Sequence, residues 1–81
     1  MEGITVLLFG PLREDMGVSQ IDIFDTKVRS VSDLRNYMIK NYPNSSMVEK
    51  CMVAVDHKYA SEETILSSRN EIALIPPVSG G

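Results

Sequence analysis

The sequence is poor in the residues that most catalytic and metal-binding sites need. Its 81 residues include one histidine, His57, and one cysteine, Cys51, so an internal disulfide is excluded and no set of histidine and cysteine metal ligands is available. Tryptophan is absent, and no glycine-rich phosphate loop is present. The longest apolar run extends only from Ala73 to Val78, whereas a membrane-spanning helix needs about 20 residues. These absences predict a soluble protein with no metal centre.

Positive charge is also scarce. Eight Lys and Arg residues stand against eleven Asp and Glu residues, which gives a net charge of −3 and a pI of about 4.9. A protein that binds a nucleic-acid backbone normally carries a basic face, so we expect neither a nucleic-acid partner nor a membrane partner. The single cysteine and the lack of a secretory signal pattern predict a cytosolic location.

The two residues with the most catalytic potential are better explained as structural ones. Cys51 lies in an apolar run and is interpreted as a small buried hydrophobe. His57, between Asp56 and Lys58, is interpreted as a solvated turn residue. No third group is placed to orient them as a nucleophile and its base. The chain is therefore not expected to be an enzyme by itself.

Side-chain alternation predicts four strands, over residues 3–9, 20–24, 51–55 and 71–75. The first carries apolar residues on both faces, which suits a central strand. Gly10-Pro11 ends this strand, and a polar stretch from Arg13 to Gly17 leads to the second.

A single main helix is predicted between the second and third strands. Ser30 and Asp33 have the spacing of an N-cap and an acidic N3 residue, and Pro43 ends the helix because a proline disfavours the α conformation of the residue before it. The apolar stripe expected to face the sheet is Val31, Leu34, Met38 and Tyr42, and the residues expected to point away are Arg35, Asn36 and Lys40.

This element order predicts an α+β domain, residues 1–75, in which one helix crosses one face of a single sheet. The other face of the sheet is left uncovered. Phe9, Tyr59 and Ile75 are candidates for a contact surface if they lie on that face; the alternative is that all three pack in the core or at an edge.

The end of the chain, residues 76–81, is predicted to be a projecting tail. Pro76 and Pro77 favour a stiff, extended segment, and Gly80 and Gly81 lack side chains, so a narrow channel can admit them. The carboxylate of Gly81 is ionised at neutral pH and a poor electrophile, so a partner would have to activate it. A bare Gly-Gly end would otherwise indicate only a flexible terminus.

Three segments resemble the small-subunit family of molybdopterin synthase: residues 71–81 (EIALIPPVSGG), residues 6–14 (VLLFGPLRE), and residues 53–56 (VAVD) before Tyr59. The resemblance runs nearly end to end, and the tail is its most specific part. It implies a ubiquitin-like β-grasp fold with a mixed sheet, in which the first and last strands lie side by side at the centre.

The resemblance further implies a sulfur carrier. Gly81 would be adenylated by a ubiquitin-activating-type adenylyltransferase that uses ATP, converted to a thiocarboxylate, and inserted into the large synthase subunit, where its sulfur passes to cyclic pyranopterin monophosphate. No cofactor would be bound stably, the catalytic residues would belong to the large subunit, and the assembly would be a heterotetramer. The residues implied for tail insertion are Pro76, Pro77, Val78, Ser79 and Gly80, and those for the partner interface are Phe9, Arg13, Tyr59 and Ile75.

The chain departs from the family pattern at two places. The family commonly has Gly-Asp-Glu where this chain has Arg69-Asn70-Glu71, and Asn, like Gly, can adopt a positive φ. The usual asparagine after the third strand is Asp56 here.

Three alternatives remain open from the sequence. A related β-grasp sulfur carrier could serve thiamine synthesis or tRNA thiolation. A ubiquitin-like modifier could be joined through Gly81 to lysines of target proteins. A β-grasp interaction module could carry an inert tail.

Overall fold

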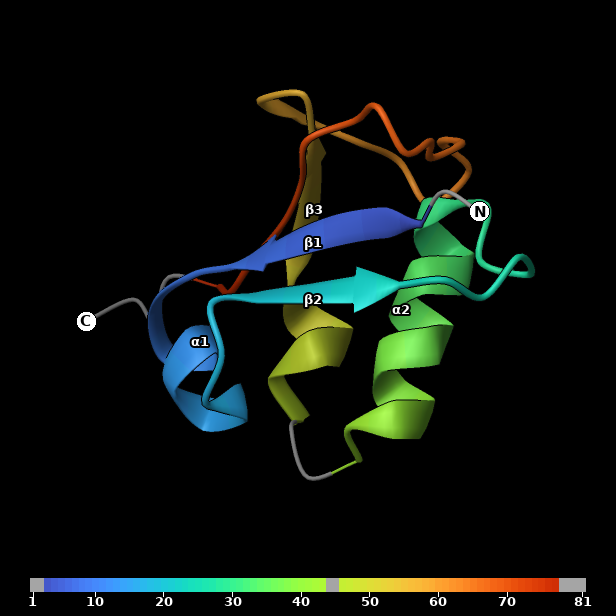
Figure 1. Cartoon of the computed structure of the whole chain (residues 1–81). Coiled ribbons are helices and arrows are strands. Elements are labelled where there is room, and N and C mark those ends of the chain that lie inside the picture. Colours follow the sequence, from blue (N-terminus) through green and yellow to red (C-terminus); the bar gives the residue numbers. More distant parts are fainter. Residues whose placement is uncertain (1–2, 44–45, 78–81) are drawn as a thin grey trace.

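One mixed sheet of five strands, covered on one side by helices, makes up the computed structural model, which describes residues 3–43 and 46–77 (Figure 1). The strands are β1 (Ile4–Leu8), β2 (Gln20–Ile23), β3 (Met52–Val55), β4 (Lys58–Tyr59) and β5 (Ile72–Ile75). The helices are α1 (Gly10–Met16), α2 (Val31–Asn41) and the short 3-10 helix η1 (Ser46–Lys50). The four predicted strands are confirmed to within one residue at each end, and β4 was not predicted.

The strands lie in the order β2-β1-β5-β3-β4. β1 and β5, at opposite ends of the chain, pair in parallel, and the other neighbours pair antiparallel. The expectation that the first strand is central and lies beside the last is therefore confirmed. This arrangement is that of the ubiquitin-like β-grasp.

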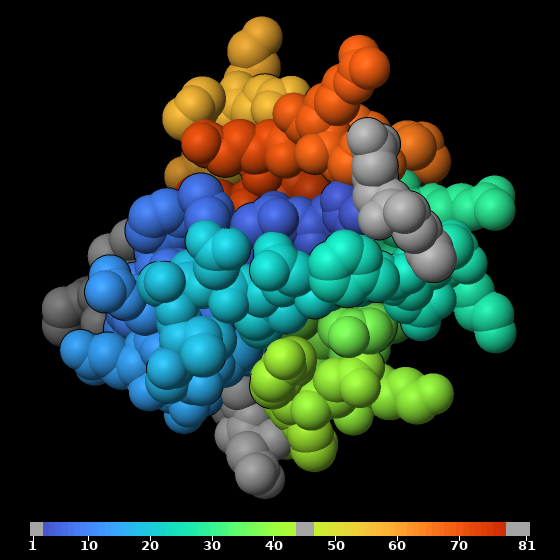
Figure 2. Space-filling view, in the orientation of Figure 1, coloured from blue at the N-terminus to red at the C-terminus, as the bar shows by residue number. Residues whose placement is uncertain are grey.

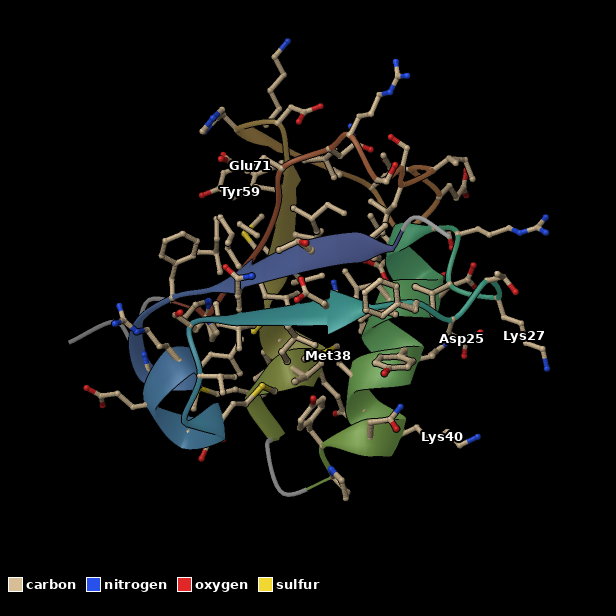
Figure 3. All side chains as sticks on the ribbon, viewed as in Figure 1. Asp25, Lys27, Met38, Lys40, Tyr59 and Glu71 are labelled. Atoms are coloured by element: carbon tan, nitrogen blue, oxygen red, sulfur yellow. The ribbon has the colours of Figure 1, made fainter. Side chains whose placement is uncertain are left out.

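The core lies between the sheet and α2. Ile72 and Leu74 of β5 are fully buried, as are Leu34 and Met38 of α2. Figure 3 shows Met38 between the helix and the sheet, while Lys40, farther along α2, points outward. The predicted apolar stripe of the helix is confirmed at Val31, Leu34 and Met38, which are buried, and Tyr42 is half-buried against the core.

The start of α2 is held by a reciprocal capping box, as the sequence predicts. The Ser30 hydroxyl accepts a hydrogen bond from the Asp33 amide (3.1 Å), and the Asp33 carboxylate accepts from the Ser30 amide (3.0 Å) and the Arg29 amide (3.0 Å). The two backbone amides lower the pKa of Asp33 because they stabilise its charged form, and the Arg29 amide has the larger effect.

Helix α1 lies in the polar stretch for which sequence patterns predicted no element. Pro11 suits the first turn of a helix, where its missing N–H has no partner to lose. Leu12 is fully buried and Met16, four positions later, packs against the core, while Gly17 ends the helix with a φ of 74°. The space-filling view shows α1 beside β2 and α2 below it (Figure 2).

Arg35 was expected to point away from the protein, and the structure corrects this. Its Nη1 donates to the carbonyls of Val48 and Cys51, both at 2.8 Å, and its Nε and Nη2 pair with the Glu62 carboxylate at 2.9 Å. The side chain is only 17% exposed. Arg35 thus ties α2 to η1, to the start of β3 and to the loop around Glu62. Cys51 is buried, as predicted, and burial raises the pKa of its thiol.

Candidate functional site

The face of the sheet opposite the helices has a polar half and an apolar half. Thr5, Gln20 and Asp22 are exposed on the β2 side, where the Thr5 hydroxyl donates to the Asp22 carboxylate at 2.8 Å. The side toward β3 and β4 is apolar. The apolar half adjoins the end of β5, from which the tail continues.

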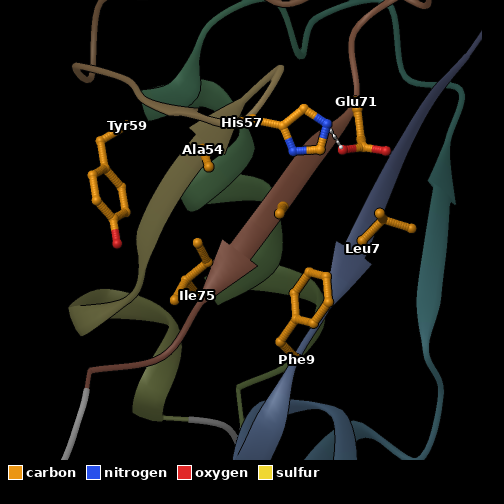
Figure 4. Close-up of a pocket in the computed structure, with 8 residues that line it drawn as sticks. Leu7, Phe9, Ala54, His57, Tyr59, Glu71 and Ile75 are labelled. Carbon is orange, nitrogen blue, oxygen red and sulfur yellow. Dashed lines mark ion pairs between the residues drawn. The ribbon is translucent and has the colours of Figure 1, made fainter.

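The apolar half is hollowed by a depression of about 350 Å³ (Figure 4). Its floor is formed by Ala54 of β3 and Ala73 of β5, which are directly paired across the two strands. The short alanine side chains leave a space between larger neighbours. The residues lining this hollow are Leu7, Phe9, Ala54, His57, Tyr59, Glu71, Ala73 and Ile75.

Three of the predicted interface residues meet in the hollow. Phe9 directly follows β1, Tyr59 lies on β4 and Ile75 on β5. The exposed fractions of Phe9 and Tyr59 are 47% and 67%. All three therefore lie on the uncovered face, and Tyr59 lies there on the edge strand β4. Arg13 lies elsewhere, on α1, beside a separate depression that includes Val18.

The tail begins where the hollow ends. Pro76 is half-buried and Pro77 exposed, and both follow β5 without regular secondary structure. The remaining tail residues named above, Val78, Ser79, Gly80 and Gly81, lie outside the described residues.

Sequence reasoning missed five residues of the hollow, namely Leu7, Ala54, His57, Glu71 and Ala73. Strand alternation could have placed Leu7 on the same face as Phe9, Ala73 on the same face as Ile75, and Ala54 on the same face as Met52, since residues two positions apart in a strand share a face. Alternation could also have found Met52, which is 49% exposed and is paired with Ile75.

His57 and Glu71 form the polar end of the hollow. The His57 Nε2 and the Glu71 Oε2 are 2.9 Å apart, and their side chains are 82% and 51% exposed. His57 lies in the tight turn between β3 and β4, where Asp56 and His57 have φ values of 52° and 70°. His57 is therefore the exposed turn residue that was predicted, but its side chain has a partner fourteen positions later in the chain.

The two departures from the family pattern contact each other. The Asn70 Nδ2 donates to the Asp56 Oδ2 at 2.8 Å, and the Glu71 amide donates to the Asp56 Oδ1 at 2.8 Å. Both hydrogen bonds lower the pKa of Asp56, and the one from the Glu71 amide has the larger effect. The family pattern described above has asparagine and aspartate at these positions, so by that resemblance the amide and the carboxylate have exchanged places. Asn70 does not use the positive φ that is open to it, and among the described non-glycine residues it is Asp56 and His57 that have a positive φ.

This arrangement suits a contact surface. Within residues 3–43 and 46–77, no three His, Cys, Asp or Glu side chains are grouped to hold a metal ion. No helix in that part of the chain is long and apolar enough to cross a membrane. The hollow instead offers a preformed apolar depression, one carboxylate at its rim, and a strand that leads directly into the tail.

Comparison with known proteins gives one family match and several relatives. The model of the ThiS family matches residues 6–81. The molybdopterin synthase sulfur carrier subunit of Caenorhabditis elegans is 36% identical over 84 aligned positions that cover 100% of both chains. The subunit of the same name from Arabidopsis thaliana is 32% identical over 79 residues, which are 96% of this chain and 82% of that protein.

Solved structures show the same fold. A putative molybdopterin converting factor subunit 1 from Pyrococcus furiosus has a TM-score of 0.77 at 22% identity and covers 96% of this chain and 100% of that one. A chain in the complex of subunits 1 and 2 of molybdopterin-converting factor from Helicobacter pylori has a TM-score of 0.69 at 24% identity, and the match covers 98% of this chain and 99% of that one.

The exchanged pair of Asp56 and Asn70 can be tested by restoring the family's order. N70D places two carboxylates together and should lower the urea midpoint the most, and D56N should lower it less because an amide oxygen can still accept from the Glu71 amide. The double variant D56N/N70D should return close to the wild type, since Asn also tolerates the positive φ of position 56.

The pH dependence supplies a second readout for the same variants. The pKa of Asp56 is lower in the folded protein than in the unfolded chain. The ionised Asp56 carboxylate therefore stabilises the folded state at a pH above its unfolded pKa. This stabilisation is lost as the pH falls from the unfolded pKa to the folded pKa. The gap between the wild type and D56N should therefore close below about pH 4. A double variant that is less stable than both single variants would contradict the pairing.

Proposed function

The chain belongs to the ThiS family and, within it, to the sulfur carrier subunits of molybdopterin synthase, and from this premise we propose that it carries sulfur as a thiocarboxylate on Gly81. In this proposal the β-grasp domain docks on a large synthase subunit and the tail reaches that subunit's active site. The sulfur is delivered there to cyclic pyranopterin monophosphate.

The observation that carries the proposal is the continuity of β5, the hollow and the tail. Ala73 and Ile75 line the hollow, and Pro76 follows Ile75 directly. A partner that covers the hollow therefore holds the strand from which the tail leaves. The tail spans about 20 Å if residues 76–81 are fully extended, which is enough to enter a deep active site on the same partner.

The proposed chemistry starts by activating an anion. An oxygen of the Gly81 carboxylate attacks the α-phosphate of ATP on an adenylyltransferase, and pyrophosphate leaves. A sulfide-level sulfur then attacks the acyl carbon and displaces AMP, which leaves a thiocarboxylate. Gly81 has no β-carbon, so nothing shields the acyl carbon from this attack.

Delivery follows on the large subunit. The thiocarboxylate sulfur attacks a carbon of the pterin precursor and displaces an oxygen substituent from that carbon. Water then hydrolyses the bond between the acyl carbon and the sulfur, which leaves the sulfur on the pterin and regenerates the Gly81 carboxylate. The product dithiolene holds two sulfur atoms and each carrier holds one, so two loaded carriers are consumed for each product. The acids, bases and phosphate-binding groups belong to the large subunit, and the assembly is a heterotetramer.

The role of Gly81 is tested by intact-mass analysis. After incubation with the adenylyltransferase, ATP and a sulfur source, the wild type should gain the mass of one sulfur in exchange for one oxygen. A variant that ends at Gly80, and one with an alanine added after Gly81, should deliver no sulfur in the synthase reaction because the reactive carboxyl is absent or displaced.

Circular dichroism provides the control for these tail variants, since both should unfold at the temperature of the wild type. A wild type that gains no sulfur, or an alanine-extended variant that still supports dithiolene formation, would rule out this mechanism.

The docking face is tested by a pair of exposed apolar residues. Tyr59, at 67% exposed, lines the hollow, whereas Ile65, at 70% exposed, does not. Y59S should weaken binding to the large subunit about tenfold because it removes a wall of the hollow. I65S removes a similarly exposed apolar side chain and should leave the affinity unchanged, as measured by isothermal titration calorimetry. Equal losses in the two variants would place the contact outside the hollow.

A further inference from the structure

We propose that the hollow receives a lysine or arginine side chain of the large subunit, whose aliphatic stem lies on Ala54 and Ala73 and whose cation pairs with Glu71. This inference rests on the proposed function, because it names the partner group that the docking face would take. It also assigns a role to Glu71 that the sulfur chemistry does not require.

The shape of the hollow suits a long, unbranched side chain. Its floor is the pair of small residues Ala54 and Ala73, and its walls are Leu7, Phe9 and Tyr59. Methylene groups of a lysine or arginine stem can pack on such a surface while the charged head extends beyond it. Glu71 and His57 lie at one end of the floor, and Ile75 and Phe9 lie at the other (Figure 4).

The carboxylate of Glu71 is held at the polar end by a fixed backbone. The Glu71 amide donates to the Asp56 carboxylate, and the Glu71 carbonyl accepts from the Asp56 amide, both at 2.8 Å. The side chain of Glu71 is nevertheless 51% exposed, so an incoming group can reach it. Tyr59 and Glu71 both lie on the side of the sheet away from α2 (Figure 3).

His57 leaves this carboxylate with capacity for a second donor. Its Nε2 lies 2.9 Å from the Glu71 Oε2, and it is the one side chain paired with Glu71 among the described residues. A carboxylate has two oxygens and several lone-pair sites, so a partner's cation can bind Oε1 while the imidazole keeps Oε2 in place.

The charge of the hollow selects the chemistry of the occupant. Glu71 is negative, and none of the eight lining residues is a lysine or arginine. An aliphatic or aromatic occupant that covered this end would strip water from Glu71 without replacing it, which costs free energy, and an acidic occupant would be repelled. A basic side chain satisfies both the apolar floor and the carboxylate.

Two variants at the pair of His57 and Glu71 separate docking from local structure. E71Q removes the charge that the partner's cation needs, whereas H57N keeps it and also tolerates the positive φ of position 57. Calorimetric titration with the large subunit should show that E71Q binds about tenfold more weakly at low salt and loses part of the salt dependence of binding. The affinity of H57N should be within about twofold of the wild-type affinity. This change is well below the tenfold loss expected for E71Q, which corresponds to about 1.4 kcal/mol.

E63Q supplies the charge-matched control, because Glu63 is exposed and lies outside the hollow. It should bind as the wild type does. The inference would be overturned if E71Q bound the large subunit with wild-type affinity and salt dependence. It would also be overturned if E71Q and H57N lost the same amount of affinity. Neither result would contradict the sulfur-carrier function. A wild type that fails to bind the large subunit would instead overturn the proposed function and, with it, this inference.

Discussion

The rest of the structure depends on the position of strand β5. One face of this strand belongs to the core, the other face lines the hollow, and its end leads into the tail. Ile72 and Leu74 are fully buried under α2, while Ala73 and Ile75 line the hollow on the open face. The strand is held on both sides, in parallel by β1 and antiparallel by β3. A register shift of one residue would exchange the buried and exposed sets, so the packing of the core also fixes the docking face and the direction in which the chain leaves at Pro76.

The open face achieves its selectivity with few groups. Thr5, Gln20 and Asp22 expose polar groups on the β2 side, and the apolar side chains of the hollow lie next to the tail. At the rim of the hollow Glu71 contributes the charge, and its backbone is anchored by the turn at Asp56. In the function proposed above, the chain supplies a contact surface and a reloadable carboxylate, and its partners supply the activation and the transfer.

Much of the fold could be predicted from the sequence, and the reasons for the exceptions are physical. The helix after Ser30 was predictable because the capping residues Ser30 and Asp33 are local signals. Helix α1 was missed because Gly10-Pro11 was interpreted only as a strand end, although a proline also suits the first turn of a helix. The hollow could not be predicted, since it depends on the register that sets Ala54 opposite Ala73. The pairing of His57 with Glu71 likewise requires a tight turn that no single segment of sequence reveals.

The most direct measurement for the central claim, that the open sheet face and the tail form one functional surface, is an amide chemical-shift map of the isotope-labelled chain titrated with the large subunit. The account predicts shifts at Leu7, Ala54, Ala73 and Ile75 together with the tail amides, and none at Asn36 and Lys40 on the outer side of α2. Shifts confined to α2, with the amides of the hollow unchanged, would contradict it.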